Sequence, residues 1–237
     1  MDSLVQIRSL LDSGQFEAAL TAIDSLGGLA DGPQAPAEVR VLRMTALNGL
    51  GRWQETIDLG KPLLSSLSSQ TEATLRGRVH ALLGYATLRK GDSRNAESHL
   101  RAAIHVATWE ASEPSDVVRY QRILAFMFHG MGLWRQARHE LLNAIGIADD
   151  RELDRESGGL RLNLALSELK TGDLGSVPTI IDLATEYLAR TDQRKRLLLC
   201  ALVRSNYLRI TGQPNNSSFP AMQELMRKRS AAAGKQT

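Results

Sequence analysis

The sequence predicts an all-α fold, a solenoid of about six antiparallel helix pairs. Glycine recurs at intervals of 37 to 41 residues, and the residues around each glycine repeat as well. The segments on either side carry apolar residues at the 3–4 spacing of an amphipathic helix. The six recurring glycines are Gly14, Gly51, Gly91, Gly132, Gly172 and Gly212.

Three positions around each glycine repeat from one end of the chain to the other. The residues seven before the glycine are Ile7, Met44, Gly84, Ala125, Ala165 and Ser205. The residues two after it are Phe16, Trp53, Ser93, Trp134, Leu174 and Pro214. The residues five after it are Ala19, Thr56, Ala96, Ala137, Val177 and Ser217. Glycine just past a helix end takes the left-handed conformation easily, and small residues on both sides let two helices approach closely.

The boundaries of the predicted helices carry recognisable signals. Residues 69–72 form a capping box, and Pro114 suits the first turn of a helix. Residues 27–33 and Ser157-Gly158-Gly159 are predicted to break the chain between repeats. We expect one helical-repeat domain over residues 1–229, whose last helix starts near residue 218, and a flexible tail over residues 230–237.

These small-residue, glycine, aromatic and alanine positions resemble the tetratricopeptide repeat (TPR) family over roughly residues 3–228. Residues 83–96 and 124–137 match best. A repeat of 40 residues exceeds the usual length of about 34, and in this the chain resembles the TPR region of large bacterial activators of the maltose-regulator type. The resemblance implies a right-handed solenoid that serves as a binding scaffold, without the DNA-binding or ATPase module of those activators.

Composition narrows the class of protein. The single cysteine, Cys200, excludes an intramolecular disulfide and lies in an apolar run typical of a buried position. The start of the chain lacks the pattern of a signal peptide, and no segment is apolar for the length of a membrane span, so a cytoplasmic location without membrane contact is expected. Residues 190–237 carry ten basic and two acidic side chains, against a net charge of −5 before them.

The sequence predicts no enzyme, no cofactor and no metal site. It contains no phosphate-binding glycine loop, and its five histidines do not form a metal-ligand spacing. The acidic run over residues 149–156 is predicted to be a solvated turn or helix start, because it lacks the ligand spacing of a calcium loop. Trp53 and Trp134 are predicted to fill the corners of their turns rather than to stack on a ligand.

In a TPR-like stack the first helix of each pair lines the concave surface, so the resemblance also implies where a partner binds. The glycine register places an arginine-rich stripe there that contains aromatic and asparagine side chains but no acid. Arginine grips carboxylates and aromatics supply rigid contact area. The predicted partner-binding groove consists of Arg78, Tyr85, Arg89, Arg119, Arg122, Phe126, His129, Lys170, Asn206 and Arg209, with Arg8, Thr45 and Asn48 on the same stripe.

The function predicted from this stripe is a non-catalytic scaffold that binds a protein or peptide, with an acidic segment as the expected partner. One alternative is a regulatory module that senses a small molecule or a signalling peptide. A further alternative is nucleic-acid binding through the basic end over residues 190–237. The oligomeric state stays open at this point.

Overall fold

The computed structural model describes residues 2–26, 35–191 and 193–213. Within these ranges the chain forms α-helices and no β-strand, and none of the helices is both long and apolar enough to cross a bilayer. The α-helices are α1 (Asp2–Asp12), α2 (Phe16–Asp24), α3 (Ala37–Gly49), α4 (Trp53–Ser66), α5 (Ala73–Arg89), α6 (Ser93–His105), α7 (Pro114–Gly130), α8 (Trp134–Asp150), α9 (Asp154–Thr171), α10 (Val177–Arg190) and α11 (Arg194–Thr211).

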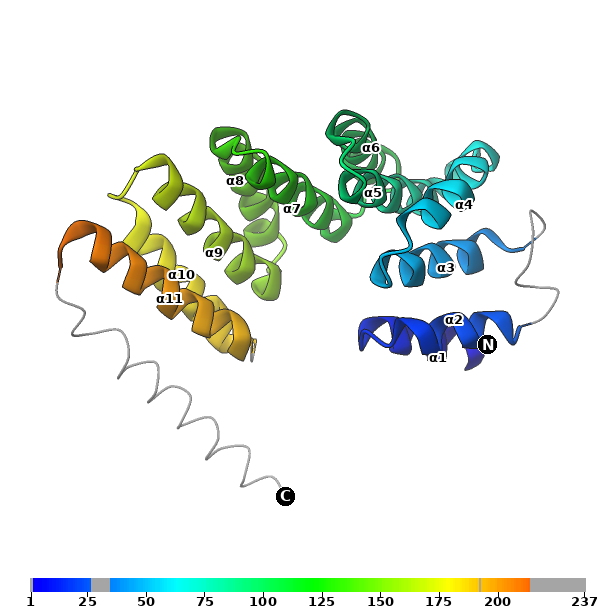
Figure 1. Cartoon of the computed structure of the whole chain (residues 1–237), viewed down its shortest axis with the longest axis horizontal. Coiled ribbons are helices and arrows are strands. Elements are labelled where there is room, and N and C mark those ends of the chain that lie inside the picture. Colours follow the sequence, from blue (N-terminus) through cyan, green and yellow to red (C-terminus); the bar gives the residue numbers. More distant parts are fainter. Residues whose placement is uncertain (1, 27–34, 192, 214–237) are drawn as a thin grey trace, which may run out of the picture. The chain divides into compact units, whose positions relative to one another are not determined.

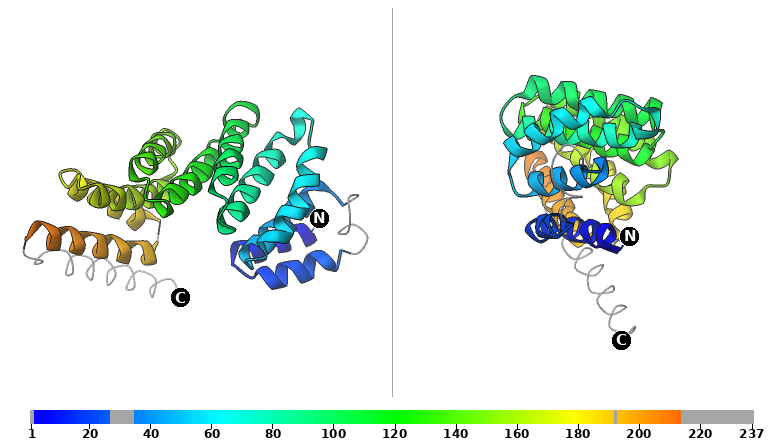
Figure 2. Two further views of the ribbon diagram at one scale, coloured as in Figure 1. Left: turned by 45° about the horizontal axis from the view of Figure 1, so that its top comes forward. Right: turned by 90° about the vertical axis from the view of Figure 1, so that its right-hand side faces the viewer.

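The helices form two compact units, unit 1 over residues 1–124 and unit 2 over residues 125–237, and the boundary falls within α7. In unit 1, α1 packs on α2, α3 on α4 and α5 on α6; in unit 2, α9 packs on α8 and α10 (Figure 1). The views in Figure 2 show the same consecutive pairing inside each unit. The predicted single domain over residues 1–229 stays a prediction, and the predicted last helix and tail lie outside the described residues.

The six glycines turn the chain as the sequence predicts. Each has a positive φ, between 69° and 89°. The residue after each glycine donates its backbone N–H to the carbonyl five residues earlier, as Gln15 does to Leu10 and Gln213 does to Leu208. This hydrogen bond closes a helix end that would otherwise leave a carbonyl without a partner. The same helix-ending turn therefore occurs six times.

The residues that flank these turns form the interior of each pair. The residue five after the glycine is fully buried in all five described repeats that have one, including Ala96 and Ala137. A Cβ added to Gly84 would lie 2.8 Å from Leu100 Cγ and 3.2 Å from the carbonyl oxygen of Ala96. Because there is no room for a side chain at Gly84, the predicted close approach of α5 and α6 is confirmed.

The predicted boundaries are confirmed at two places and wrong at a third. The capping box at Ser69 and Glu72 forms, and α7 begins at Pro114. Ser157-Gly158-Gly159 does not break the chain, however, but lies buried inside α9. A Cβ on Gly158 would lie 2.7 Å from Leu188 Cγ, so this glycine admits α10 close to α9 rather than ending a helix. The predicted break over residues 27–33 falls outside the described residues.

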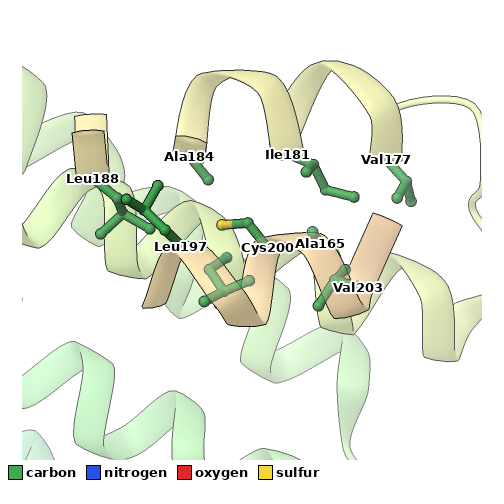
Figure 3. Packing of buried hydrophobic residues seen from close by; sticks show 9 residues of the cluster. Ala165, Val177, Ile181, Ala184, Leu188, Leu197, Cys200 and Val203 are labelled. Carbon is green, nitrogen blue, oxygen red and sulfur yellow. The ribbon is translucent and has the colours of Figure 1, made fainter. Parts of the chain in front are cut away.

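The core of unit 2 contains the one cysteine. Val177, Ile181, Ala184 and Leu188 of α10 face Cys200 and its neighbours on α11, and the sulfur lies among them (Figure 3). Cys200 is fully buried, and burial raises the pKa of its thiol to about 11. The predicted role of a small buried hydrophobic side chain is confirmed, because a thiol held neutral in this way is a poor nucleophile.

Candidate binding groove in unit 1

Unit 1 contains a cavity of about 940 Å³ between its first helices α1, α3, α5 and the start of α7. We call it the unit 1 cavity. Phe16 and Trp53, the residues two after their glycines, also line it. Its volume lies in the range of sites that enclose a ligand or a peptide side chain. Seven residues of the predicted stripe line the cavity: Arg8, Thr45, Asn48, Arg78, Tyr85, Arg89 and Arg119.

An aromatic and cationic cluster forms one wall of the cavity. The rings of Trp53 and Tyr85 meet edge to face, with centroids 5.6 Å apart. The guanidinium carbon of Arg89 lies 5.4 Å from the centroid of the Trp53 ring, at the distance of a cation–π contact. Trp53 also covers Gly51, where a Cβ would lie 3.5 Å from the indole ring. Trp53 thus fills its corner, as predicted, and contributes to the cavity wall as well.

The sequence missed one acidic side chain, Asp116 in the first turn of α7. Its carboxylate lies 2.9 Å from Nη2 of Arg119 and 3.6 Å from Nε of Arg78, and it accepts a hydrogen bond of 3.2 Å from the Tyr120 hydroxyl. Burial raises the pKa of Tyr120 to about 12, so the hydroxyl stays a donor. The sequence signal was the spacing of Asp116, three residues before Arg119 and four before Tyr120, which puts all three on one helix face.

The arginines of the cavity therefore differ in what they contact. Arg8 forms an ion pair with Glu38, and Arg78 and Arg119 share Asp116. Arg89 is exposed and contacts the Trp53 ring, with no carboxylate at ion-pair distance among the residues that the structure describes. Asp116 therefore offsets the repulsion between the like charges of Arg78 and Arg119. Arg89 is the cation of the cavity that is left to an anionic ligand.

Two polar residues of the stripe already have partners within unit 1. Asn48 is 6% exposed and donates from Nδ2 to the backbone oxygen of Leu82 at 3.0 Å, which ties α3 to α5. The hydroxyl of Thr45 donates to the backbone oxygen of Val41 at 2.9 Å. The Nδ2 group of Asn48 thus ties two neighbouring first helices together.

The other predicted groove residues do not line the unit 1 cavity. Arg122 is partly buried on α7 within unit 1 and has an interaction of its own. In unit 2, Phe126 is 58% exposed, and Lys170 and Arg209 are also exposed. Arg209 donates to Oδ1 of Asn206 at 2.8 Å.

His129 has a structural environment in unit 2. Its Nε2 lies 2.5 Å from Oγ of the buried Ser167, and its ring lies 5.3 Å from that of Trp134. Burial lowers the pKa of His129, so the ring is neutral near pH 7. Trp134 therefore covers a histidine at its corner, in line with its predicted packing role.

A second histidine environment lies between α5 and α6 in unit 1. Nδ1 of His80 and Nδ1 of His99 are 3.1 Å apart, which is a hydrogen bond between two neutral rings. Burial lowers the pKa of His80 to about 4 and also lowers that of His99. Over residues 2–26, 35–191 and 193–213, no group of three or more His, Cys, Asp or Glu side chains is placed to hold a metal ion.

No family model and no curated protein matches the sequence. Solved structures do match the fold. BtubC (BKLC) from P. vanneervenii has a TM-score of 0.67 at 13% identity, over 98% of this chain and 92% of that protein. A putative kinesin light chain from Podosopora anserina with nearly identical TPR-like repeats has a TM-score of 0.59 at 17% identity, over 80% of this chain and 95% of that protein. A substituted form of that kinesin light chain gives 0.59 at 16% identity, over 81% and 95% of the two chains.

These similarities confirm the predicted fold class, an all-α, TPR-like arrangement of helix pairs. At 13 to 17% identity they show the fold alone. The predicted resemblance to the maltose-regulator type of activator finds no counterpart among these structures and stays a prediction.

Proposed function

We propose that this chain is a non-catalytic scaffold that binds an acidic segment of a protein or peptide in the unit 1 cavity. One observation carries the proposal: four arginines and four aromatic side chains of unit 1 line a single cavity between neighbouring first helices. Arginine and aromatic residues are the types that dominate protein-binding surfaces, since they combine charge with rigid contact area. The TPR-like fold of the similar structures is compatible with such a role.

The charge of the cavity favours an acidic partner. Arg8, Arg78 and Arg119 have carboxylate neighbours inside unit 1, whereas Arg89 contacts the Trp53 ring and has no carboxylate at ion-pair distance in the described part of the chain. A partner carboxylate at Arg89 would gain a charge-assisted hydrogen bond without breaking an ion pair. Trp53 and Tyr85 beside it would cover an apolar or aromatic side chain of the same segment.

The small-molecule sensor would use the same cavity, but a closed and mainly apolar chamber would suit it better than a wall of arginines. Nucleic-acid binding through the basic end has less support from the described residues. On α11 the side chains interleaved with Lys195 and Arg209 are exposed leucines, and Tyr207, the aromatic residue of that helix, is partly buried. Exposed aromatics for base stacking are therefore missing from residues 193–213.

Fluorescence anisotropy with three labelled probes tests the proposal. The probes are a decapeptide of alternating Glu and Tyr, the matched decapeptide of Lys and Tyr, and a single-stranded RNA of ten nucleotides. We expect the Glu–Tyr peptide to bind tightest, and its affinity to fall as salt rises, because exposed charges are screened over about 10 Å at 0.1 M salt. Tightest binding of the RNA would replace the proposal with the nucleic-acid alternative.

A further inference from the structure

Asp116 has the contacts that an anionic ligand would make in the unit 1 cavity. Its two carboxylate oxygens face the guanidinium groups of Arg119 at 2.9 Å and Arg78 at 3.6 Å. Its own side chain is 12% exposed, while those of both arginines are 45% exposed. The carboxylate is therefore inside the protein, and the two cations it holds are on the cavity wall.

The surroundings keep Asp116 in this place. The Tyr120 hydroxyl donates to Oδ2 of Asp116 and accepts from Nη2 of Arg119 at 3.2 Å, and the Tyr120 ring is 1% exposed. The guanidinium carbon of Arg119 also lies 5.1 Å from the centroid of that ring. A buried tyrosine thus fixes the carboxylate and one arginine from the same helix, which makes the arrangement a rigid part of α7.

We infer that Asp116 is an internal competitor that holds Arg78 and Arg119 away from an anionic ligand and so sets which anions the unit 1 cavity accepts. The inference rests on the proposed function, because it concerns the same cavity. It follows from the contacts that Asp116 both occupies guanidinium donors and places a negative charge behind them. Arg89 can bind the carboxylate of a ligand that has one. A second ligand carboxylate near Arg78 and Arg119 is repelled by the negative charge of Asp116.

The substitution Asp116→Asn removes the charge and keeps the shape. The amide oxygen can still accept from Tyr120, so the ring and α7 keep a hydrogen bond at this point. The matched control is Asp12→Asn, because Asp12 lines the same cavity but holds none of these arginines. Both variants change the charge of the cavity by the same amount, and only one releases Arg78 and Arg119.

Two readouts are measured on the full chain. For the Glu–Tyr decapeptide, we expect Asp116→Asn to tighten binding about tenfold and Asp12→Asn to change it less than about twofold, because relieving a like charge at short range outweighs relieving a distant one. For sodium sulfate, we expect the melting temperature of Asp116→Asn to rise more than that of the wild type or of Asp12→Asn, because an ion that binds the folded state stabilises it.

The outcomes separate this inference from the proposed function. Weaker or unchanged peptide binding by a folded Asp116→Asn overturns the inference, since Asp116 would then position the arginines for the ligand. If neither the wild type nor the variant binds the peptide, the proposed function is wrong, and the sulfate readout alone decides the inference: equal shifts in the three proteins overturn it.

If Asp116→Asn does not fold, two single substitutions that keep Asp116 test the inference instead. We expect Arg119→Gln to weaken peptide binding less than about twofold and Arg89→Gln to weaken it about tenfold, because Asp116 already occupies Arg119 and not Arg89. Equal losses from the two glutamine variants contradict a competitor at Asp116.

Discussion

Units 1 and 2 share their buried positions and differ at the positions beside them. In the described residues, the position five after the glycine is fully buried in three repeats of unit 1 and in two of unit 2. Six residues before the glycine, by contrast, unit 1 has Arg8, Thr45 and Tyr85, and unit 2 has Phe126, Leu166 and Asn206. Phe126 is 58% exposed and Leu166 39%. One register therefore forms the same helix pairs in both units, while the side chain six before the glycine lines the cavity in unit 1 and is exposed in unit 2.

The fold and the binding chemistry therefore depend on separate positions of the repeat. Buried sites tolerate only small or well-fitting side chains, because interiors are close-packed. Exposed sites on the first helices have no such constraint and can carry whatever chemistry a partner requires. Substitutions at the shared buried position should thus lower stability to a similar extent in either unit. Substitutions at exposed positions should lower the affinity for the partner in unit 1 but not in unit 2.

The largest expected effect is on the shared buried position. Ala96→Trp in unit 1 and Ala137→Trp in unit 2 should each destabilise the protein by about 1–3 kcal/mol or more, because a fully buried alanine has no room for an indole. Thermal unfolding followed by circular dichroism measures the loss. Gln136→Trp, at the exposed position next to Ala137, is the control, and a melting temperature equal to that control would show that the register is misassigned.

A smaller effect is the pH dependence of stability, to which the partly buried His80 should contribute and the exposed His105 should not. Burial lowers the pKa of His80 from 6.5 to about 4, so between these values the unfolded chain binds more protons than the folded one. The free energy of unfolding should fall as the pH drops from about 6.5 toward about 4. Urea unfolding at several pH values measures this, and His80→Gln should lessen the decline while His105→Gln, at an exposed site, should not. If the free energy of unfolding declines as much in His80→Gln as in the wild type, His80 is not the source of the pH dependence.

The smallest expected effect lies in the basic end of the described chain. Lys195→Glu reverses an exposed charge of α11 in unit 2. It should change the affinity for the Glu–Tyr decapeptide by less than about twofold, because Lys195 does not line the unit 1 cavity and exposed charges are screened by salt. Anisotropy titration at about 0.1 M salt measures it, and a large loss would move the binding site from the unit 1 cavity to the basic end.

The sequence predicted the turns and the buried register because these depend on local constraints. A glycine at each helix end and a small residue five positions later leave few alternatives for the chain between them. The predicted break at Gly158 was wrong for a physical reason. The sequence alone does not distinguish a glycine that lets a neighbouring helix pack closely from a glycine that ends a helix. The distance to Leu188, 30 residues away in the chain, decides between the two.

The groove residues were predicted less completely, since their roles depend on contacts between repeats. The stripe from the resemblance placed seven side chains on the unit 1 cavity. It could not show that Asn48 bonds to Leu82, or that Arg78 of α5 reaches Asp116 of α7. Such contacts join residues more than 30 positions apart in the chain, and only the packing of neighbouring helices brings them together.

We propose that the acidic partner binds in unit 1, and within it at Arg89. Arg89 and Lys170 are a matched pair for testing it, because each is an exposed cation two residues before its glycine, one in each unit. The direct measurement is the affinity of the Glu–Tyr decapeptide for Arg89→Glu and for Lys170→Glu, with circular dichroism to confirm that both variants fold. We expect a loss of about tenfold or more for Arg89→Glu, since removing one charge-assisted contact costs about 1.5–3 kcal/mol, and little change for Lys170→Glu. Equal affinities for the two variants, or a greater loss for Lys170→Glu, would contradict it.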